Sequence, residues 1–284
     1  MRSSDAIWLQ ALRIRQIEEF VQAQLPSGII RCPVHLALGH EVVPCAVLSM
    51  LPPETRMWSN HRCHADYLAK GGDLAEMFGE LLGRQGGCCK GRGGSMHLAD
   101  PEHHFLGADC ILGCGASLAV GSSFAAKLRG ETWPSVVFGG DSVIEQGAFF
   151  EALHLSTLYR LPVIFVVQDN GIASGTLKSA RRASGWNACR IASAIGIYNA
   201  QIDGTMPASI ESVLRQMGRR RDAEPMLIEW RLEKLCSHVG WNEPMKQWPD
   251  HLETIRRENP DAIVTNEKEI ESCWKEALTW PEAS

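Results

Sequence analysis

The runs GGDS at residues 139–142 and QDNGI at 168–172 decide the fold. Each run follows an apolar, strand-like segment, VVF at 136–138 before the first and LPVIFVV at 161–167 before the second. A helix-length segment lies between them, so the pattern predicts a strand–helix–strand unit with parallel strands. The second apolar segment is uninterrupted, which is typical of a parallel strand buried on both faces.

The polar side chains that follow these two strands are Asp141 and Asn170, 29 positions apart. Parallel strands end at a common edge of an open α/β sheet, and ligands bind beyond that edge. A carboxylate, an amide oxygen, a backbone carbonyl, water and two phosphate oxygens would form the near-octahedral oxygen set that Mg²⁺ prefers. The spacing is equally compatible with a structural alternative, in which Asp141 caps a helix and Asn170 belongs to a turn.

Periodic apolar patterns predict the elements around this unit. Ser142 to Glu145 (SVIE) is a capping-box pattern, which predicts that a helix opens there. Asp73 is a candidate helix cap. Helices are expected at 5–25, 39–50 (from about Pro44), 73–83, 113–128, 207–221 and 266–278, and a further strand at 226–232. The sequence therefore predicts an α/β fold, with a doubly wound parallel sheet and helices on both faces.

Two segments are rich in small residues. The glycine-rich run QGGCCKGRGGSMH at 85–97 is either a mobile surface loop or a loop whose backbone closely approaches a bound group. The segment at 113–128 permits close packing of another backbone, within the chain or across a subunit interface.

Composition narrows the class of protein. The chain has 284 residues, 45% of them hydrophobic, and a net charge of −5, so we expect no nucleic-acid partner. The ten cysteines are scattered without C-x-x-C spacing, and Cys88-Cys89 is a poor zinc pattern, so reduced thiols are expected. The N-terminus lacks the apolar core of a signal peptide, and no apolar run reaches membrane-spanning length. These features predict a soluble cytoplasmic protein with no membrane partner.

Several motifs resemble those of the alpha subunits of thiamine diphosphate-dependent 2-oxo acid dehydrogenases, the pyruvate, branched-chain 2-oxo acid and acetoin dehydrogenases. The segment from Gly139 to Asn170 is similar to the family's GDG…NN cofactor motif. The other similar motifs, in the family's order, are HLALGHE (35–41), NHRCHA (60–65), LLGRQGGCCKGRGGSMHLAD (81–100), GADCILG (107–113), IDG (202–204) and EWRLEKLCSH (229–238). The resemblance implies a diphosphate-side, thiamine diphosphate-binding domain at residues 1–240 and a C-terminal tail with a final helix at 241–284.

The resemblance also implies roles for individual residues. Asp141, Asn170 and the carbonyl of Ile172 would hold Mg²⁺. His35 would line the substrate side of the thiazolium, and with His238 it is a candidate catalytic residue. The further cofactor contacts implied are Ser142, Arg62, Lys234 and His238 at the diphosphate, His61 beside Arg62, and the backbone of Cys110 and Leu112 at the aminopyrimidine.

The family's chemistry implies two cofactors, thiamine diphosphate and Mg²⁺. The enzyme would be a dehydrogenase acting on a 2-oxo acid or an acyloin. An enamine or carbanion would form on the cofactor, and the acyl unit would pass to a lipoyl-type acceptor carried by an acyltransferase. A separate beta subunit would supply the activating glutamate within an α2β2 heterotetramer.

The chain departs from the family's pattern at several positions. It has GDS in place of GDG, QDN in place of ENN, His40 in place of Gln, Cys110 in place of Gly, and Lys234 in place of Arg. The segment after His238 is also altered, to VGWNEPMKQWPD. One alternative is therefore a carboligase or transketolase-like enzyme that transfers the unit to an aldehyde without a lipoyl partner. The other is a non-catalytic scaffold, against which the retained Asp141, Asn170, Arg62 and His238 argue.

Overall fold

The computed structural model describes residues 4–204, 224–232, 235–236 and 250–283, and the single positions 210, 212, 213 and 215. The chain forms two compact units. The first comprises Met50–Asn60 and Asp109–Glu233, and the second comprises Arg2–Ser49, His61–Ala108 and Lys234–Ser284. The domain boundary expected at residue 240 lies outside the described residues and stays a prediction.

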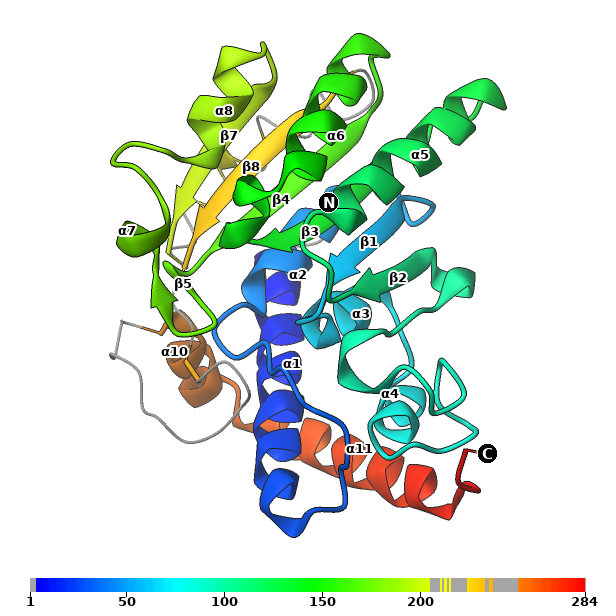
Figure 1. Ribbon diagram of the computed structural model, residues 1–284. Helices are drawn as coiled ribbons and strands as arrows, with labels where there is room; N and C mark the ends of the chain where they lie inside the picture. Colours follow the sequence, from blue (N-terminus) through cyan, green and yellow to red (C-terminus); the bar gives the residue numbers. More distant parts are fainter. Residues whose placement is uncertain are drawn as a thin grey trace. The chain divides into compact units, whose positions relative to one another are not determined.

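The first unit is built on a parallel sheet (Figure 1). Its strands run in the order β1 (Arg56–Asn60), β3 (Ser135–Gly140), β4 (Val163–Asp169), β8 (Met226–Arg231) and β7 (Tyr198–Asp203), each parallel to its neighbour. The strand β2 (Phe105–Asp109) spans the boundary between the two units. The expected strands at 135–138, 161–167 and 226–232 are confirmed.

Three helices of this unit share one apolar core on the same face of the sheet, α5 (Cys114–Leu128), α6 (Gly147–Leu158) and α8 (Ala188–Ala194) (Figure 1). Helix α5 packs on α6, β1 and β3, so its buried small residues, among them Ala116, Ala119 and Ala126, pack within this unit. The residues that point to the opposite face are also buried, among them Val136, Phe138, Ile164, Val166 and Ile228. Burial of both faces explains the uninterrupted apolar run at 161–167.

The capping-box prediction at Ser142 is wrong. Residues Asp141–Glu145 form a 3₁₀ turn, and α6 begins only at Gly147 without a side-chain cap. The Glu145 carboxylate pairs instead with Arg181 and Arg182. The Glu145 side chain, which a capping box would place on the helix N-terminus, therefore forms ion pairs with residues distant in the sequence.

The second unit is mainly helical. Its helices are α1 (Ser4–Gln24), α2 (Val42–Leu48), α3 (His64–Lys70), α4 (Leu74–Leu81), α10 (His251–Glu258) and α11 (Pro260–Thr279). The helices expected at 5–25, 73–83 and 266–278 are confirmed, and α11 begins earlier than expected, at Pro260. Asp73 caps α4 as predicted, by accepting a hydrogen bond from the backbone of Glu76 at 2.9 Å. Most of the helix expected at 207–221 lies outside the described residues.

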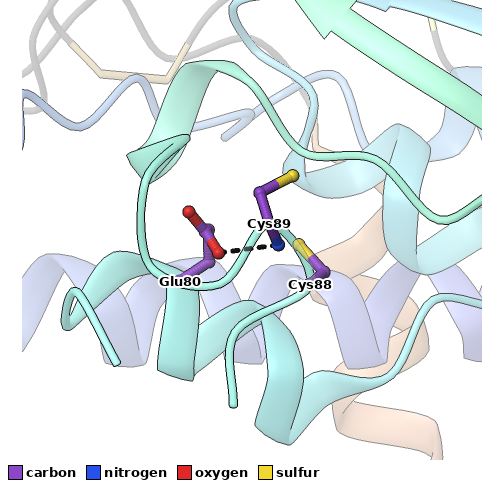
Figure 2. A group of neighbouring side chains, drawn as sticks. All are labelled: Glu80, Cys88 and Cys89. Carbon is purple, nitrogen blue, oxygen red and sulfur yellow. Dashed lines mark hydrogen bonds between the residues drawn. The ribbon is translucent and has the colours of Figure 1, made fainter. Parts of the chain in front are cut away.

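The glycine-rich loop is built around Glu80, a side chain on α4 that is 1% exposed (Figure 2). One carboxylate oxygen accepts hydrogen bonds from the backbone N–H groups of Cys89 and Gly91, both at 2.8 Å. The other accepts from the backbone N–H groups of Gly93 and Gly94. A buried carboxylate needs such donors, because burial without them is costly.

Several glycines in this loop and on the neighbouring α4 have no room for a side chain, because other atoms of the protein lie close to their Cα atoms. A Cβ atom on Gly87 would lie 2.6 Å from the backbone nitrogen of Glu80. A Cβ atom on Gly79 or Gly86 would collide with the ring of Trp280, at 2.6 and 2.3 Å respectively. The close backbone approach that the sequence suggested is thus made, in the described structure, to Glu80 and Trp280.

We expect Glu80→Gln to destabilise the protein. The substitution replaces one acceptor oxygen with an amide NH₂, so two backbone N–H groups would face a donor. Each buried unsatisfied donor costs about 1–3 kcal/mol, so the free energy of unfolding should fall by about 2–6 kcal/mol in urea titrations. The control is Glu271→Gln, at an exposed α11 residue that pairs with exposed Lys275, where the change should stay within about 0.5 kcal/mol. Equal small effects for the two variants would contradict this account of the loop.

Candidate functional site

The first unit brings Asp141 and Asn170 to the ends of neighbouring strands. The β3–β4 register pairs Gly140 with Gln168, so Asp141 follows one strand where the second reaches Asp169 and Asn170. The predicted placement at the carboxyl edge of the sheet is confirmed. Their role as Mg²⁺ ligands stays a prediction.

Asp141 is held by two arginines from a later segment. The Asp141 side chain is 4% exposed, and its Oδ2 accepts from Arg181 Nη2 at 2.5 Å and from Arg182 Nη2 at 2.8 Å. Arg182 Nη2 also donates to the Asp141 carbonyl at 2.7 Å, and both arginines pair with Glu145. A cation that binds Asp141 would therefore share this carboxylate with guanidinium groups or displace them.

Asn170 lies in a turn that leads into a short hairpin. Its Oδ1 accepts a hydrogen bond from the backbone N–H of Ile172 at 3.1 Å, the contact of an Asx turn. The hairpin pairs β5 (Ile172–Ala173) with β6 (Thr176–Leu177), and its two loop residues, at 174 and 175, both have positive φ. This hairpin determines where the Ile172 carbonyl, the third predicted ligand, lies.

The Asp in QDN, where the family pattern has a first Asn, is neutralised within the chain. Asp169 is 4% exposed and forms an ion pair with Lys178. Its second oxygen accepts from the backbone N–H of Gly171 at 3.0 Å. The negative charge of Asp169 is therefore balanced by a cation nine residues later.

The two predicted aminopyrimidine contacts differ in their surroundings. Leu112 lines a cavity of about 20 Å³, together with Asn60, Gly139, Phe149 and Phe165, whereas Cys110 is exposed. A cavity of this size holds a water molecule and is too small for an aromatic ring. Ser142 is buried in the 3₁₀ turn after Asp141.

The second unit brings three predicted residues together. The imidazole rings of His35 and His61 meet edge to face, with centroids 5.0 Å apart. Arg62 is 7% exposed and donates to the carbonyl of Leu36 at 2.8 Å. Burial lowers the pKa of the Arg62 guanidinium, because removal from water disfavours the charged form. An anionic ligand at Arg62 would offset that cost.

A buried network that the sequence did not indicate holds the segment bearing His35. His64 lies between Glu18 and Ser95, with its Nδ1 2.7 Å from the Glu18 carboxylate and its Nε2 2.9 Å from the Ser95 hydroxyl. The Ser95 hydroxyl accepts from the backbone N–H of His35 at 3.1 Å, and Glu18 accepts from that of Ala37 at 2.6 Å. The network therefore ties residues 35–37 to the glycine-rich loop and to the start of α3.

Lys234 and His238 lie outside the described residues, as does the altered segment after His238. The two described residues between them lie against the His35 segment. The Leu235 backbone N–H donates to the carbonyl of Leu38 at 3.1 Å, and the Cys236 thiol lies 4.0 Å from the carbonyl of Leu36. Residues 235 and 236 thus lie beside the segment that carries His35.

The residues that sequence reasoning missed are polar groups that act at long range. Arg181 and Arg182 contact Asp141 although they lie 40 and 41 positions from it in the sequence. Glu18 contacts His64 across 46 positions. The only sequence signal for the arginines was the basic run KSARR at 178–182. Nothing in the local sequence indicated that Ser95 or Glu80 would organise backbone groups.

We expect His64→Ala to destabilise the protein and to loosen the His35 segment. The change removes the partner of a fully buried carboxylate, which typically costs about 3–5 kcal/mol. It should also speed amide hydrogen exchange at His35 and Ala37 under native conditions. The matched control is His154→Ala, at an exposed α6 position, which should shift neither measurement. Unchanged amide exchange at residues 35–37 would contradict the inference that the His64 network holds this segment.

Comparisons with known proteins show the family of the chain. The family model "Dehydrogenase E1 component" matches residues 10–275. The alpha subunit of acetoin:2,6-dichlorophenolindophenol oxidoreductase from Bacillus subtilis is 37% identical over 266 residues, which is 91% of this chain and 78% of that protein. The corresponding subunit from Cupriavidus necator is 35% identical, over 88% of this chain and 75% of that protein. The alpha subunit of a Rhizobium meliloti pyruvate dehydrogenase E1 component is 31% identical, over 88% and 72% of the two chains. The chain therefore belongs to the dehydrogenase E1 component family, among the alpha subunits of thiamine diphosphate-dependent 2-oxo acid and acetoin dehydrogenases, and the resemblance expected from its motifs is confirmed.

Proposed function

We propose that this chain is the diphosphate-binding alpha subunit of a thiamine diphosphate-dependent dehydrogenase whose substrate is an acyloin such as acetoin, or a 2-oxo acid. The observation that carries the proposal is the placement of Asp141 and Asn170 after neighbouring strands at one edge of a parallel sheet. The most similar curated relatives cited above support the acyloin as the first substrate to test.

The donor set suits Mg²⁺. Asp141, Asn170 and the carbonyl of Ile172 would provide only oxygen ligands, which a hard cation prefers. Arg62, with Lys234 and His238, would contact the diphosphate, Ser142 would lie beside it, and His61 would lie beside Arg62. When bound, thiamine diphosphate supplies a nucleophilic carbon and an electron sink.

The chain's own residues would hold and orient this group. The backbones of Cys110 and Leu112 would face the aminopyrimidine. His35 would line the substrate side, where the Ser95 hydroxyl holds its backbone at 3.1 Å. His238 would act with it as the second candidate catalytic residue.

A beta subunit would complete the site. The curated relatives are named as alpha subunits, and we propose that the partner supplies the activating glutamate in an α2β2 assembly. The surface supports a partner, because α5 and α6 expose large apolar side chains, including Phe124, Leu128, Leu155 and Leu158. We propose a cytoplasmic location; no helix within the described ranges is long and apolar enough to cross a membrane.

The acceptor distinguishes the proposal from its alternative. The dehydrogenase would pass the acyl unit to a lipoyl-type acceptor or electrons to an artificial one, whereas a carboligase would transfer the unit to an aldehyde. None of the relatives cited above is named as a carboligase or transketolase.

The chain should be co-expressed with the beta subunit and supplied with thiamine diphosphate and Mg²⁺. Acetoin- or pyruvate-dependent reduction of 2,6-dichlorophenolindophenol is expected. Product formation only on adding an aldehyde would overturn the dehydrogenase assignment.

We expect Asp141→Ala to abolish cofactor retention without unfolding the chain. Glu145 would remain to pair with both arginines, so the fold should persist. Calorimetry should show Mg²⁺-dependent binding of thiamine diphosphate weakened by roughly a hundredfold, which equals about 2.8 kcal/mol. The control is Asp203→Ala, at an exposed carboxylate that also ends a strand of the sheet, and it should bind normally. Parent-like binding by Asp141→Ala would contradict the metal assignment.

We expect the double substitution Arg181→Gln and Arg182→Gln to strengthen the binding of Mg²⁺ alone. The two guanidinium groups and the cation would compete for the Asp141 carboxylate. Loss of a competing interaction of about 1.4 kcal/mol would raise the affinity roughly tenfold in a titration without cofactor. Arg190→Gln is the control, since its guanidinium donates to the Gly185 carbonyl. Unchanged or weaker Mg²⁺ binding would show that the arginines do not compete with the cation.

A further inference from the structure

Two adjacent thiols lie in the glycine-rich loop (Figure 2). Ligand atoms of Cys88, Cys89 and Glu80 lie within 4.8 Å of one another. Glu80 is a poor third ligand for a cation, because its two oxygens already accept four backbone N–H groups. The cluster is therefore better described as a dithiol beside an occupied carboxylate than as a metal site.

The two thiols are chemically unequal. Both side chains are half-buried. The Cys89 thiol donates to the backbone carbonyl of His97 at 3.1 Å, and the proximity of the two sulfurs lowers the pKa of Cys89 and raises that of Cys88. Exposed Lys90 and Arg92 add positive charge to the same loop. Since the thiolate is the nucleophilic form, Cys89 is the member of the pair expected to react first.

We propose that Cys88 and Cys89 form a peroxide-sensitive dithiol that closes reversibly to a vicinal disulfide. The Cys89 thiolate attacks hydrogen peroxide, so that an S–O bond forms, the O–O bond breaks and hydroxide leaves as water after taking a proton. The Cys88 sulfur, on losing its proton, then attacks the Cys89 sulfur. The S–S bond forms, the S–O bond breaks and a second water leaves. The two thiols are oxidised, and one peroxide is reduced to two waters.

The position of the pair makes this disulfide labile. Adjacent Cα atoms are about 3.8 Å apart, less than the roughly 4.4–6.8 Å across an ordinary disulfide. The closed ring is therefore strained, and strained disulfides are more easily reduced and serve as reversible ones.

Ring closure also acts on the backbone that Glu80 holds. The peptide nitrogen of Cys89 is part of the ring, and its N–H donates to Glu80 at 2.8 Å. The same carboxylate holds Gly93 and Gly94, and the next residue is Ser95, whose hydroxyl accepts from the His35 backbone. Oxidation should therefore loosen the loop as far as the His35 segment.

The first experiment uses the chain copurified with its beta subunit, treated with hydrogen peroxide and then with iodoacetamide. Peptide mass spectrometry should show that Cys88 and Cys89 together lose two hydrogen atoms and escape alkylation. Dithiothreitol should restore both thiols. Exposed Cys110 is the internal reference for a lone thiol.

The single variants Cys88→Ser and Cys89→Ser keep one thiol each. In Cys88→Ser, the remaining thiol should accumulate sulfenic acid that dimedone traps, and neither variant should form the disulfide. If Cys88 and Cys89 stay fully alkylated at a peroxide dose that oxidises Cys110, the proposal is overturned. Independent oxidation of both thiols without a linkage would overturn it as well.

Amide hydrogen exchange tests the link to His35. Oxidation of the parent should reduce protection at residues 89–95 and 35–37 by about tenfold, the factor expected from losing one hydrogen bond to a charged acceptor. The double variant Cys88→Ser and Cys89→Ser should not respond to peroxide. Disulfide formation with unchanged exchange would overturn the link. These measurements need no cofactor, so a failure to bind thiamine diphosphate would overturn the proposed function and leave this inference intact.

Discussion

The parallel pairing of β3 with β4 is the constraint on which the candidate metal site depends. It aligns Gly140 with Gln168, so both strands end at one level and their next residues share an edge. A register shift of one residue would reverse the faces of a strand whose residues are all buried, and the apolar core of α5, α6 and α8 opposes such a shift. The geometry of Asp141 and Asn170 is therefore maintained by hydrophobic packing some distance from either side chain.

Charge at this edge is balanced within the chain. Arg181 and Arg182 pair with Asp141 and Glu145, and Lys178 pairs with Asp169. The arrangement gives each of the three carboxylates, Asp141, Glu145 and Asp169, a cationic partner from residues 178–182. The segment at 178–182 therefore takes part in the site. A bound cation would compete with its basic side chains for the carboxylates at the strand ends, and a bound diphosphate could pair with the basic side chains so released.

In the second unit, two buried carboxylates each lie close to a loop and accept hydrogen bonds from its backbone. Glu80 accepts four backbone N–H groups of the glycine-rich loop, and Glu18 accepts a backbone N–H group and meets His64. In both cases a buried anion is stabilised by hydrogen bonds and in turn fixes the course of a loop. The two loops so fixed carry Cys88, Cys89 and His35.

The sequence by itself determined the fold class, the strand–helix–strand unit and the placement of Asp141 and Asn170, because a long apolar strand and a 3.6-residue helical period are local signals. Its motifs also determined the family. Local pattern failed at Ser142–Glu145, where an apparent capping box lost its glutamate to Arg181 and Arg182. Only the tertiary structure decided which polar groups meet, as in the four N–H groups at Glu80 and the link from Glu18 through His64 to Ser95. Such partners lie tens of residues apart, and hydrogen bonds between them leave no periodic trace in the sequence.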